Sequence, residues 1–148
     1  MAYLKDISRL VEAQTSILPK GYGTGAIPAS GIIAVDAQGF DRVCHVIQLG
    51  TMASGGGFDA EITESATAGG TYTLIASSGM TAITAANAKK VILIDVPVNS
   101  AKPFQKIRGT ATTAGTVSIA VGATALLYRG SGMKPTTAED VAQSVYVP

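Results

Sequence analysis

From residue 31 onward, short apolar or alternating runs are separated by turn residues, chiefly glycine, serine and asparagine. Alternation with a period of two and regularly spaced turns is typical of an all-β sandwich or barrel. The predicted strands cover residues 31–36, 41–52, 58–65, 71–76, 91–98, 104–112, 116–121 and 123–129. We therefore predict an all-β fold over residues 31–130, an antiparallel β-sandwich of the immunoglobulin-like or jelly-roll-like type. Residues 84–90 are expected to form one helical turn that crosses between the sheets.

The first 30 residues follow a different pattern. Residues 3–18 have helical spacing of their apolar positions, and Pro19 ends the pattern. Residues 20–30 contain three glycines and a proline without periodicity, as a linker does. We therefore predict an N-terminal arm over residues 1–30, an amphipathic helix or an extended segment followed by a linker. The C-terminal tail, 131–148, is expected to begin with a short turn at Thr136 and Glu139 and to add a final strand to its own or a neighbouring sheet.

The predicted arm carries an apolar stripe of Leu4, Ile7, Leu10 and Val11. Apolar surface left in water costs roughly 25 cal/mol per Å². The linker is long enough to carry the stripe away from its own core. We therefore predict that the stripe binds a neighbouring subunit or another partner.

Composition narrows the choice of partners. The chain is 47% hydrophobic and 14% charged, with a net charge of +1, so it lacks the basic surface that gathers nucleic acid or anionic lipid. No stretch reaches the roughly 18 apolar residues that span a bilayer, and residues 1–18 lack the apolar core of a secretory signal. We expect a protein made and kept in the cytoplasm, with no nucleic-acid or membrane partner. Its low charge favours a surface partly covered by another protein or by identical copies.

Few residues in the sequence are candidates for chemistry. Cys44 and His45 are adjacent, but on a strand their side chains face opposite sides, which favours a core or interface pair over a nucleophilic dyad. Asp59 and Glu61 share a strand face at a spacing that glycosidases use, although the inward Phe58 already explains this strand. One histidine and one cysteine cannot build a standard zinc site. We predict no catalytic residue, no metal and no cofactor, so the chain is not expected to be an enzyme.

Basic residues offer one candidate contact. Lys106 and Arg108 share a strand face and are candidates for binding an acidic patch of a partner. Lysines beside apolar strands also guard sheet edges against aggregation, so this alternative stays open.

Several segments together resemble small head-associated structural proteins of tailed phages. They are the Asp41-Arg-Val-Cys-His-Val-Ile-Gln-Leu-Gly50 strand, the Phe58-to-Ser65 strand with its Gly69-Gly-Thr-Tyr72 turn, the Lys90-to-Val96 strand and the Ala125-Leu-Leu-Tyr-Arg129 ending. The resemblance implies a capsid decoration or cement protein that sits on a shell of major capsid protein of the same virion. It also implies a homo-oligomer, a trimer by analogy, located on the capsid surface.

Three alternatives remain. A tail-tube, tail-terminator or head–tail connector protein has a similar composition. A carbohydrate-binding adhesion module needs exposed aromatic side chains, and the tyrosines here are few and scattered. An enzyme needs convergent polar residues, which this inventory disfavours.

Overall fold

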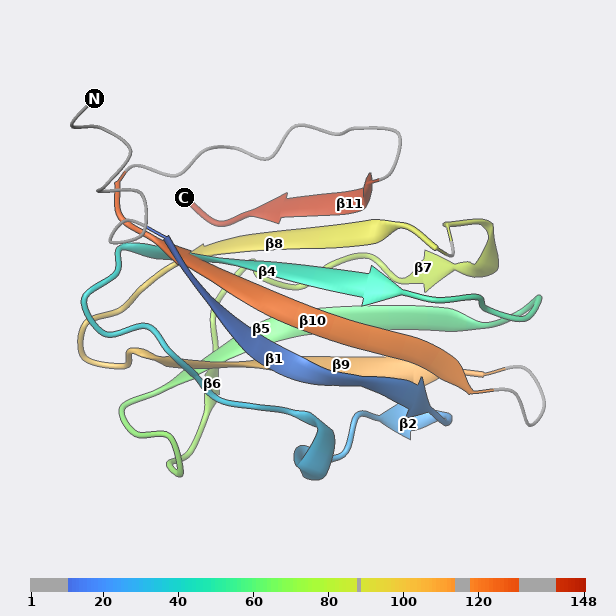
Figure 1. Cartoon of the computed structure of the whole chain (residues 1–148), viewed down its shortest axis with the longest axis horizontal. Helices are drawn as coiled ribbons and strands as arrows, with labels where there is room; N and C mark the ends of the chain where they lie inside the picture. The colour runs from blue at the N-terminus through green and yellow to red at the C-terminus, as the bar shows by residue number, and fades with distance from the viewer. Residues whose placement is uncertain (1–10, 88, 114–117, 131–140) are drawn as a thin grey trace.

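Two β-sheets packed face to face make up the protein, in a computed structural model that describes residues 11–87, 89–113, 118–130 and 141–148 (Figure 1). The predicted all-β sandwich is confirmed. The first sheet has the order β1 (Val11–Tyr22), β10 (Ile119–Tyr128), β4 (Arg42–Leu49), β8 (Val91–Pro97), β11 (Val141–Tyr146). In the second sheet β2 (Gly25–Ala26), β9 (Phe104–Thr112), β5 (Gly57–Ser65) and β6 (Thr73–Leu74) follow one another, β3 (Val35–Asp36) also pairs with β9, and β7 (Ile83–Thr84) pairs with β5.

The central strands form where alternation predicts them, at residues 41–52, 58–65, 91–98 and 104–112, except that β5 begins one residue earlier, at Gly57. Their largest inward side chains are mostly β-branched or aromatic and fill the space between the sheets. Phe58, Ile47, Ile62, Ile94 and Ile107 are all at most 1% exposed. Because apolar burial contributes roughly 25 cal/mol per Å², this layer holds the two sheets together.

The interruption predicted at Gly122, between strands at residues 116–121 and 123–129, is wrong. Residues 119–128 form the single strand β10, and residues 114–117 lie outside the described part. Gly122 looks like a breaker in the sequence, but it lies within the strand. A Cβ atom at Gly122 would come within 3.0 Å of the Pro19 Cβ atom on β1, so the glycine permits a close approach of two strands.

The predicted helix is wrong for residues 11–18, which belong to β1 and pair with β10. Ile17 is fully buried in the core whereas Leu18 is 40% exposed, so the two do not share a helical stripe. The predicted linker is wrong as well, because residues 20–30 complete β1, form β2 and bury Tyr22 and Ile27. Residues 11–28 are thus mostly extended, as one form of the predicted arm was, and a 3₁₀ turn, Ala29–Gly31, follows them; the segment is part of the sandwich.

The C-terminal residues add a strand to the chain's own sheet. β11 lies beside β8 and runs parallel to it, an exception to the predicted antiparallel arrangement. Val147, which follows β11, is 9% exposed and belongs to the core. The expected turn at Thr136 and Glu139 lies outside the described residues.

A short turn of 3₁₀ helix, Ala85–Asn87, follows β7 of the second sheet and precedes β8 of the first. The predicted crossing between the sheets over residues 84–90 is therefore confirmed, apart from Ala88, which is outside the described part.

Candidate functional site

Cys44 and His45 lie on opposite faces of β4, as their strand position predicts. The burial pattern of β4 alternates, with His45 toward the second sheet and Cys44 half-buried on the outer face. Burial, with the carboxylate of Asp95 nearby, raises the pKa of the Cys44 thiol to about 11. The thiol is therefore protonated at neutral pH, and its nucleophilic form is scarce. The pair cannot act as a dyad.

His45 forms a hydrogen bond between the two sheets. Its Nε2 atom lies 3.0 Å from Oε1 of Gln105 on β9, and Gln105 Nε2 donates to the carbonyl oxygen of Pro97 at 3.2 Å. Since that carboxamide oxygen can only accept, Nε2 of His45 carries the hydrogen. Nδ1 is buried without a partner in the described part of the chain. Burial lowers the pKa of His45 to about 4, so the ring is neutral at pH 7.

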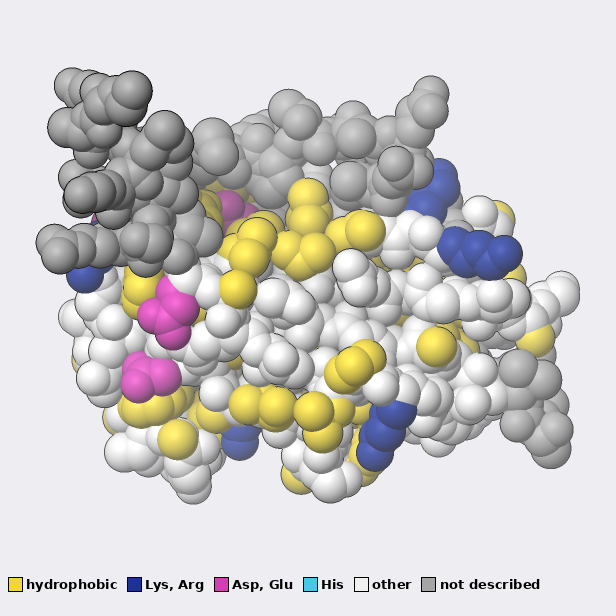
Figure 2. Space-filling model, in the orientation of Figure 1, with side chains coloured by type: hydrophobic (Ala, Val, Ile, Leu, Met, Phe, Trp, Pro, Cys, Tyr) yellow, Lys and Arg dark blue, Asp and Glu magenta, His cyan; other side chains and the backbone are white. Residues whose placement is uncertain are grey.

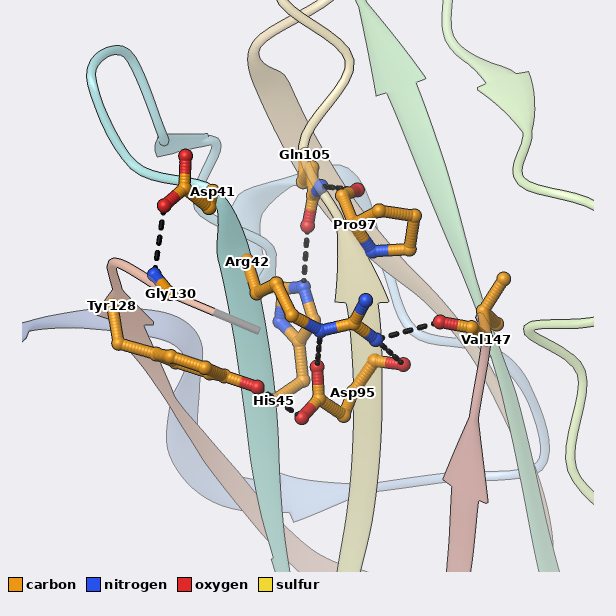
Figure 3. A network of polar contacts seen from close by, with 9 residues as sticks. All are labelled: Asp41, Arg42, His45, Asp95, Pro97, Gln105, Tyr128, Gly130 and Val147. Atoms are coloured by element: carbon orange, nitrogen blue, oxygen red, sulfur yellow. Dashed lines mark hydrogen bonds and ion pairs between the residues drawn. The ribbon is translucent and has the colours of Figure 1, made fainter. Parts of the chain in front are cut away.

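A second polar cluster lies on the outer face of the first sheet, around Asp95 of β8 (Figure 3). Arg42 Nε donates to Asp95 Oδ1 at 2.8 Å, and the hydroxyl of Tyr128 donates to Asp95 Oδ2. Arg42 Nη2 also donates to the carbonyl oxygen of Val147 at 2.6 Å, and its guanidinium carbon lies 4.5 Å from the ring centre of Tyr146. The cluster therefore joins β4, β8, β10 and the C-terminal segment.

The geometry of this cluster is that of a structural ion pair. The side chains of Arg42 and Asp95 are only 8% and 2% exposed. Burial, with the Asp95 carboxylate nearby, raises the pKa of Tyr128, which keeps its hydroxyl a donor. Both oxygens of Asp95 already accept a hydrogen bond from a strand neighbour, and the side chain is only 2% exposed, so the carboxylate is shielded from solvent.

Lys106 and Arg108 share the outer face of the second sheet, as predicted from their spacing on β9. Arg108 forms an ion pair with Glu61, which lies opposite it on β5. The ammonium of Lys106 lies 4.3 Å from the centre of the Tyr72 ring. A hollow of about 170 Å³ lies between these side chains. Lys106 has no carboxylate partner among the described residues.

The carboxylates that the sequence singled out do not converge. Asp59 is exposed and pairs across the sheet with Thr110, while Glu61 contacts Arg108. The described residues hold no group of three or more histidine, cysteine or acidic side chains that could bind a metal ion. No helix in the described ranges is long and apolar enough to cross a membrane.

The outer face of the first sheet has a different character. Its middle, which we call the five-strand face, consists of Ala13, Thr15, Cys44, Val46, Gln48, Val91, Leu93, Ala120, Gly122, Thr124 and Leu126. None of these residues is charged. Figure 2 shows hydrophobic side chains gathered over β4 and β8, with charged side chains mostly at the rim. Near Ala120 and Gly122 the face is hollowed by about 450 Å³.

Only one residue of the predicted partner-binding stripe, Val11, lies in the part of the chain that the structure describes. Leu4, Ile7 and Leu10 lie outside the described residues, and Val11 begins β1, where its backbone pairs with Tyr128. The sequence analysis missed the Arg42–Asp95 pair and the five-strand face as a unit. A charged residue inside the apolar run 91–98 was the available signal for the ion pair, because a buried charge needs a partner.

Comparisons with known proteins give distant structural likenesses. No family model matches the chain, and no curated protein matches it in sequence. A crystal structure of the infectious bursal disease virus VP2 subviral particle aligns with a TM-score of 0.47 and 13% identity, over 80% of this chain and 32% of that one. The CBM22-1–GH10 modules of Clostridium thermocellum xylanase 10B, complexed with xylohexaose, align with a TM-score of 0.42 and 7% identity, over 84% and 30%. This chain thus spans about a third of either protein.

Proposed function

We propose that this chain is a non-catalytic structural protein of a tailed-phage virion, a decoration or cement protein that binds and stabilises the capsid surface. Its partners are then the major capsid protein and other copies of itself, and its place after synthesis in the host cytoplasm is the virion. The observation that carries the proposal is the uncharged five-strand face of a two-layer sandwich. A wide neutral face with apolar side chains fits a protein that works covered by protein neighbours.

The polar clusters support the non-catalytic part of the proposal. The Nε2 hydrogen of His45 is used by Gln105, and the Asp95 carboxylate accepts from Arg42 and Tyr128. The Cys44 thiol faces away from His45. In the described part of the chain, therefore, the groups with catalytic potential serve the packing of strands.

Contacts with the shell are proposed at two places. The stripe of Leu4, Ile7, Leu10 and Val11 is one, and it stays a prediction from the sequence. Lys106 is the other, because its charge is not offset by a carboxylate among the described residues and so can attract an acidic group of the capsid protein. Arg108 is a weaker candidate, since Glu61 already offsets its charge.

Co-sedimentation of the full chain with shells assembled from the major capsid protein tests this function. We expect saturable binding, with weaker binding for Lys106→Glu. Arg129→Glu is the matched control, because it makes the same change of charge at another exposed residue. Arg129 directly follows β10, and its Nε atom donates to the carbonyl oxygen of Gly39. Absence of binding to shells, together with binding to tail tubes or connector rings, would move the protein to the tail or neck. Binding to a polysaccharide instead would favour the adhesion-module alternative.

A further inference from the structure

We propose that the hollow beside Lys106, on the outer face of the second sheet, binds one carboxylate side chain from an acidic segment of a protein partner. This inference deepens the proposed function, because it names the chemical group that Lys106 receives, and it rests on that function for the identity of the partner. The hollow has a volume of about 170 Å³ and is bordered by Ile32, Tyr72, Lys106 and Arg108. We call it the Lys106 hollow.

The course of the backbone creates the Lys106 hollow. On its side away from β5, β9 pairs with β3 at residues 104–105 and with β2 at residues 110–111. Between these two pairings the chain leaves the sheet in the 3₁₀ turn Ala29–Gly31, whose backbone hydrogen bonds are local. This turn forms one wall of the hollow, and Tyr72, which precedes β6 on the β5 side, forms the other. The site is therefore shaped by the sheet and a turn, and not by the rotamer of a single side chain.

A positive charge is held at the edge of the Lys106 hollow. Lys106 is half-buried, and its ammonium lies 4.3 Å from the centre of the Tyr72 ring. The ring is held in turn by a hydrogen bond from the Tyr72 hydroxyl to the carbonyl oxygen of Ala68, at 2.9 Å. An ammonium has three N–H donors, and a ring face can accept one of them, so donors remain for a carboxylate. Among the described residues no carboxylate of this chain is paired with Lys106.

Size and charge select a ligand with a single carboxylate. A volume of 170 Å³ is that of about six water molecules at roughly 30 Å³ each, which admits one acidic side chain but no helix. Arg108 borders the hollow as well, but the Glu61 carboxylate already offsets its charge. That carboxylate would repel a second negative charge on the ligand, so a phosphate dianion or a nucleic-acid backbone fits less well than one carboxylate.

The wall opposite Tyr72 is apolar, which favours a carboxylate carried on a peptide. Ile32 is half-buried and Ala29 is exposed, so the methylene groups of a glutamate side chain can bury apolar surface against them. A small carboxylate ion lacks these methylene groups. A sugar would instead need an open aromatic face, and the Lys106 ammonium already lies over the ring of Tyr72. The combination of a cation and an apolar wall therefore fits an acidic side chain of a protein.

An NMR titration of the isotope-labelled full chain with short blocked peptides tests the site without any shell. The probe is the tripeptide acetyl-Ala-Glu-Ala-amide, and acetyl-Ala-Gln-Ala-amide is its uncharged counterpart of the same shape. We expect the glutamate peptide to shift the amide signals of Thr63 and Ile107, which line the hollow, in a saturable way. The glutamine peptide should bind about tenfold more weakly, because it cannot form a charge-assisted hydrogen bond with Lys106.

Two lysine variants show whether the hollow itself binds the peptide. Lys106→Met removes the charge and keeps most of the length of the side chain, so it should weaken binding of the glutamate peptide about tenfold. Lys20→Met is the matched control and should leave the binding unchanged. Lys20 also lies over a tyrosine ring, with its ammonium 5.2 Å from the ring centre, but it does not border the Lys106 hollow.

The possible results separate this site from the proposed function. Equal binding of the two peptides, equal binding by wild type and Lys106→Met, or the absence of saturable shifts overturns the inference. Stronger binding of inorganic phosphate or of methyl glucoside at the same amide signals also overturns it, in favour of a general anion site or a sugar site. Peptide binding without binding to shells supports the site and refutes the proposed function, whereas shell binding without peptide binding does the reverse.

Discussion

Lowering the pH from 7 to 4 should destabilise the folded protein by about 3 kcal/mol through His45 alone. This side chain is fully buried, and burial lowers its folded-state pKa to about 4. In the unfolded chain the pKa of histidine is about 6.5. Between these values the unfolded state binds a proton that the folded state does not, so stability is full above pH 6.5 and falls as the pH drops toward 4. A shift of this size corresponds to the stated free energy at about 1.4 kcal/mol per pH unit.

The comparison of wild type with His45→Gln isolates this contribution. Glutamine does not titrate, and its amide can still donate to Oε1 of Gln105. At pH 7 the variant should be about 1–2 kcal/mol less stable because of its altered packing. The difference should shrink and then reverse in sign as the pH approaches 4, since carboxylates contribute equally to both proteins.

Urea unfolding at a fixed protein concentration, at several pH values between 7 and 4, measures the difference in the free energy of unfolding. A difference that stays constant across this range would refute the assignment of His45 as a neutral, buried donor. Equal slopes of free energy against urea in the two proteins serve as the control for an unchanged unfolding transition.

Three further predictions concern other parts of the fold. Asp95→Leu leaves the Arg42 guanidinium buried without its carboxylate, and it should lower the free energy of unfolding measured in urea by about 3–5 kcal/mol. The Arg42→Met/Asp95→Leu double variant should recover most of this loss. Similar stability of the single and double variants would contradict the prediction. The Cys44 thiol should react with a disulfide reagent at pH 8 about 100-fold more slowly than in the unfolded chain, as followed by absorbance, because its pKa is raised to about 11. Deletion of residues 1–30 removes β1 and the buried Ile17, so circular dichroism should show loss of the cooperative thermal transition, and a retained transition would mean that these residues are dispensable.

The strands that could be predicted from the sequence are those whose own residues decide their conformation. In β4 the alternation places His45 inward and Cys44 outward, as the structure shows. At residues 11–18 the apolar positions fit both a helical period and a period of two. The choice between them is made by pairing with β10, more than 100 residues away in the chain, and local spacing contains no information about that pairing.

Only one part of the Arg42–Asp95 cluster, a charge inside the apolar run 91–98 that needs a partner, could be predicted from the sequence, for a related reason. Both residues lie on the outer side of their strands, where alternation predicts exposure to water. Their burial depends on contacts from Tyr128 and Tyr146, which are brought together by four strands that are separate in the sequence. The candidate pairs drawn from sequence, such as Asp59 with Glu61, are instead neighbours in the chain and proved to have separate partners.

The two outer faces of the sandwich differ in a way that bears on function. The second sheet exposes Arg108 with Glu61 and Lys102 with Glu64, ion pairs of the kind that exposed sheet faces carry in water. The middle of the first sheet has no exposed charge, and its one ion pair, Arg42 with Asp95, is buried. Lysine and glutamate are among the commonest surface residues, so a face that is in contact with water alone is expected to carry some of them. The asymmetry is therefore best explained if the middle of the first sheet is covered by protein, which agrees with the proposed place of the chain on a virion surface.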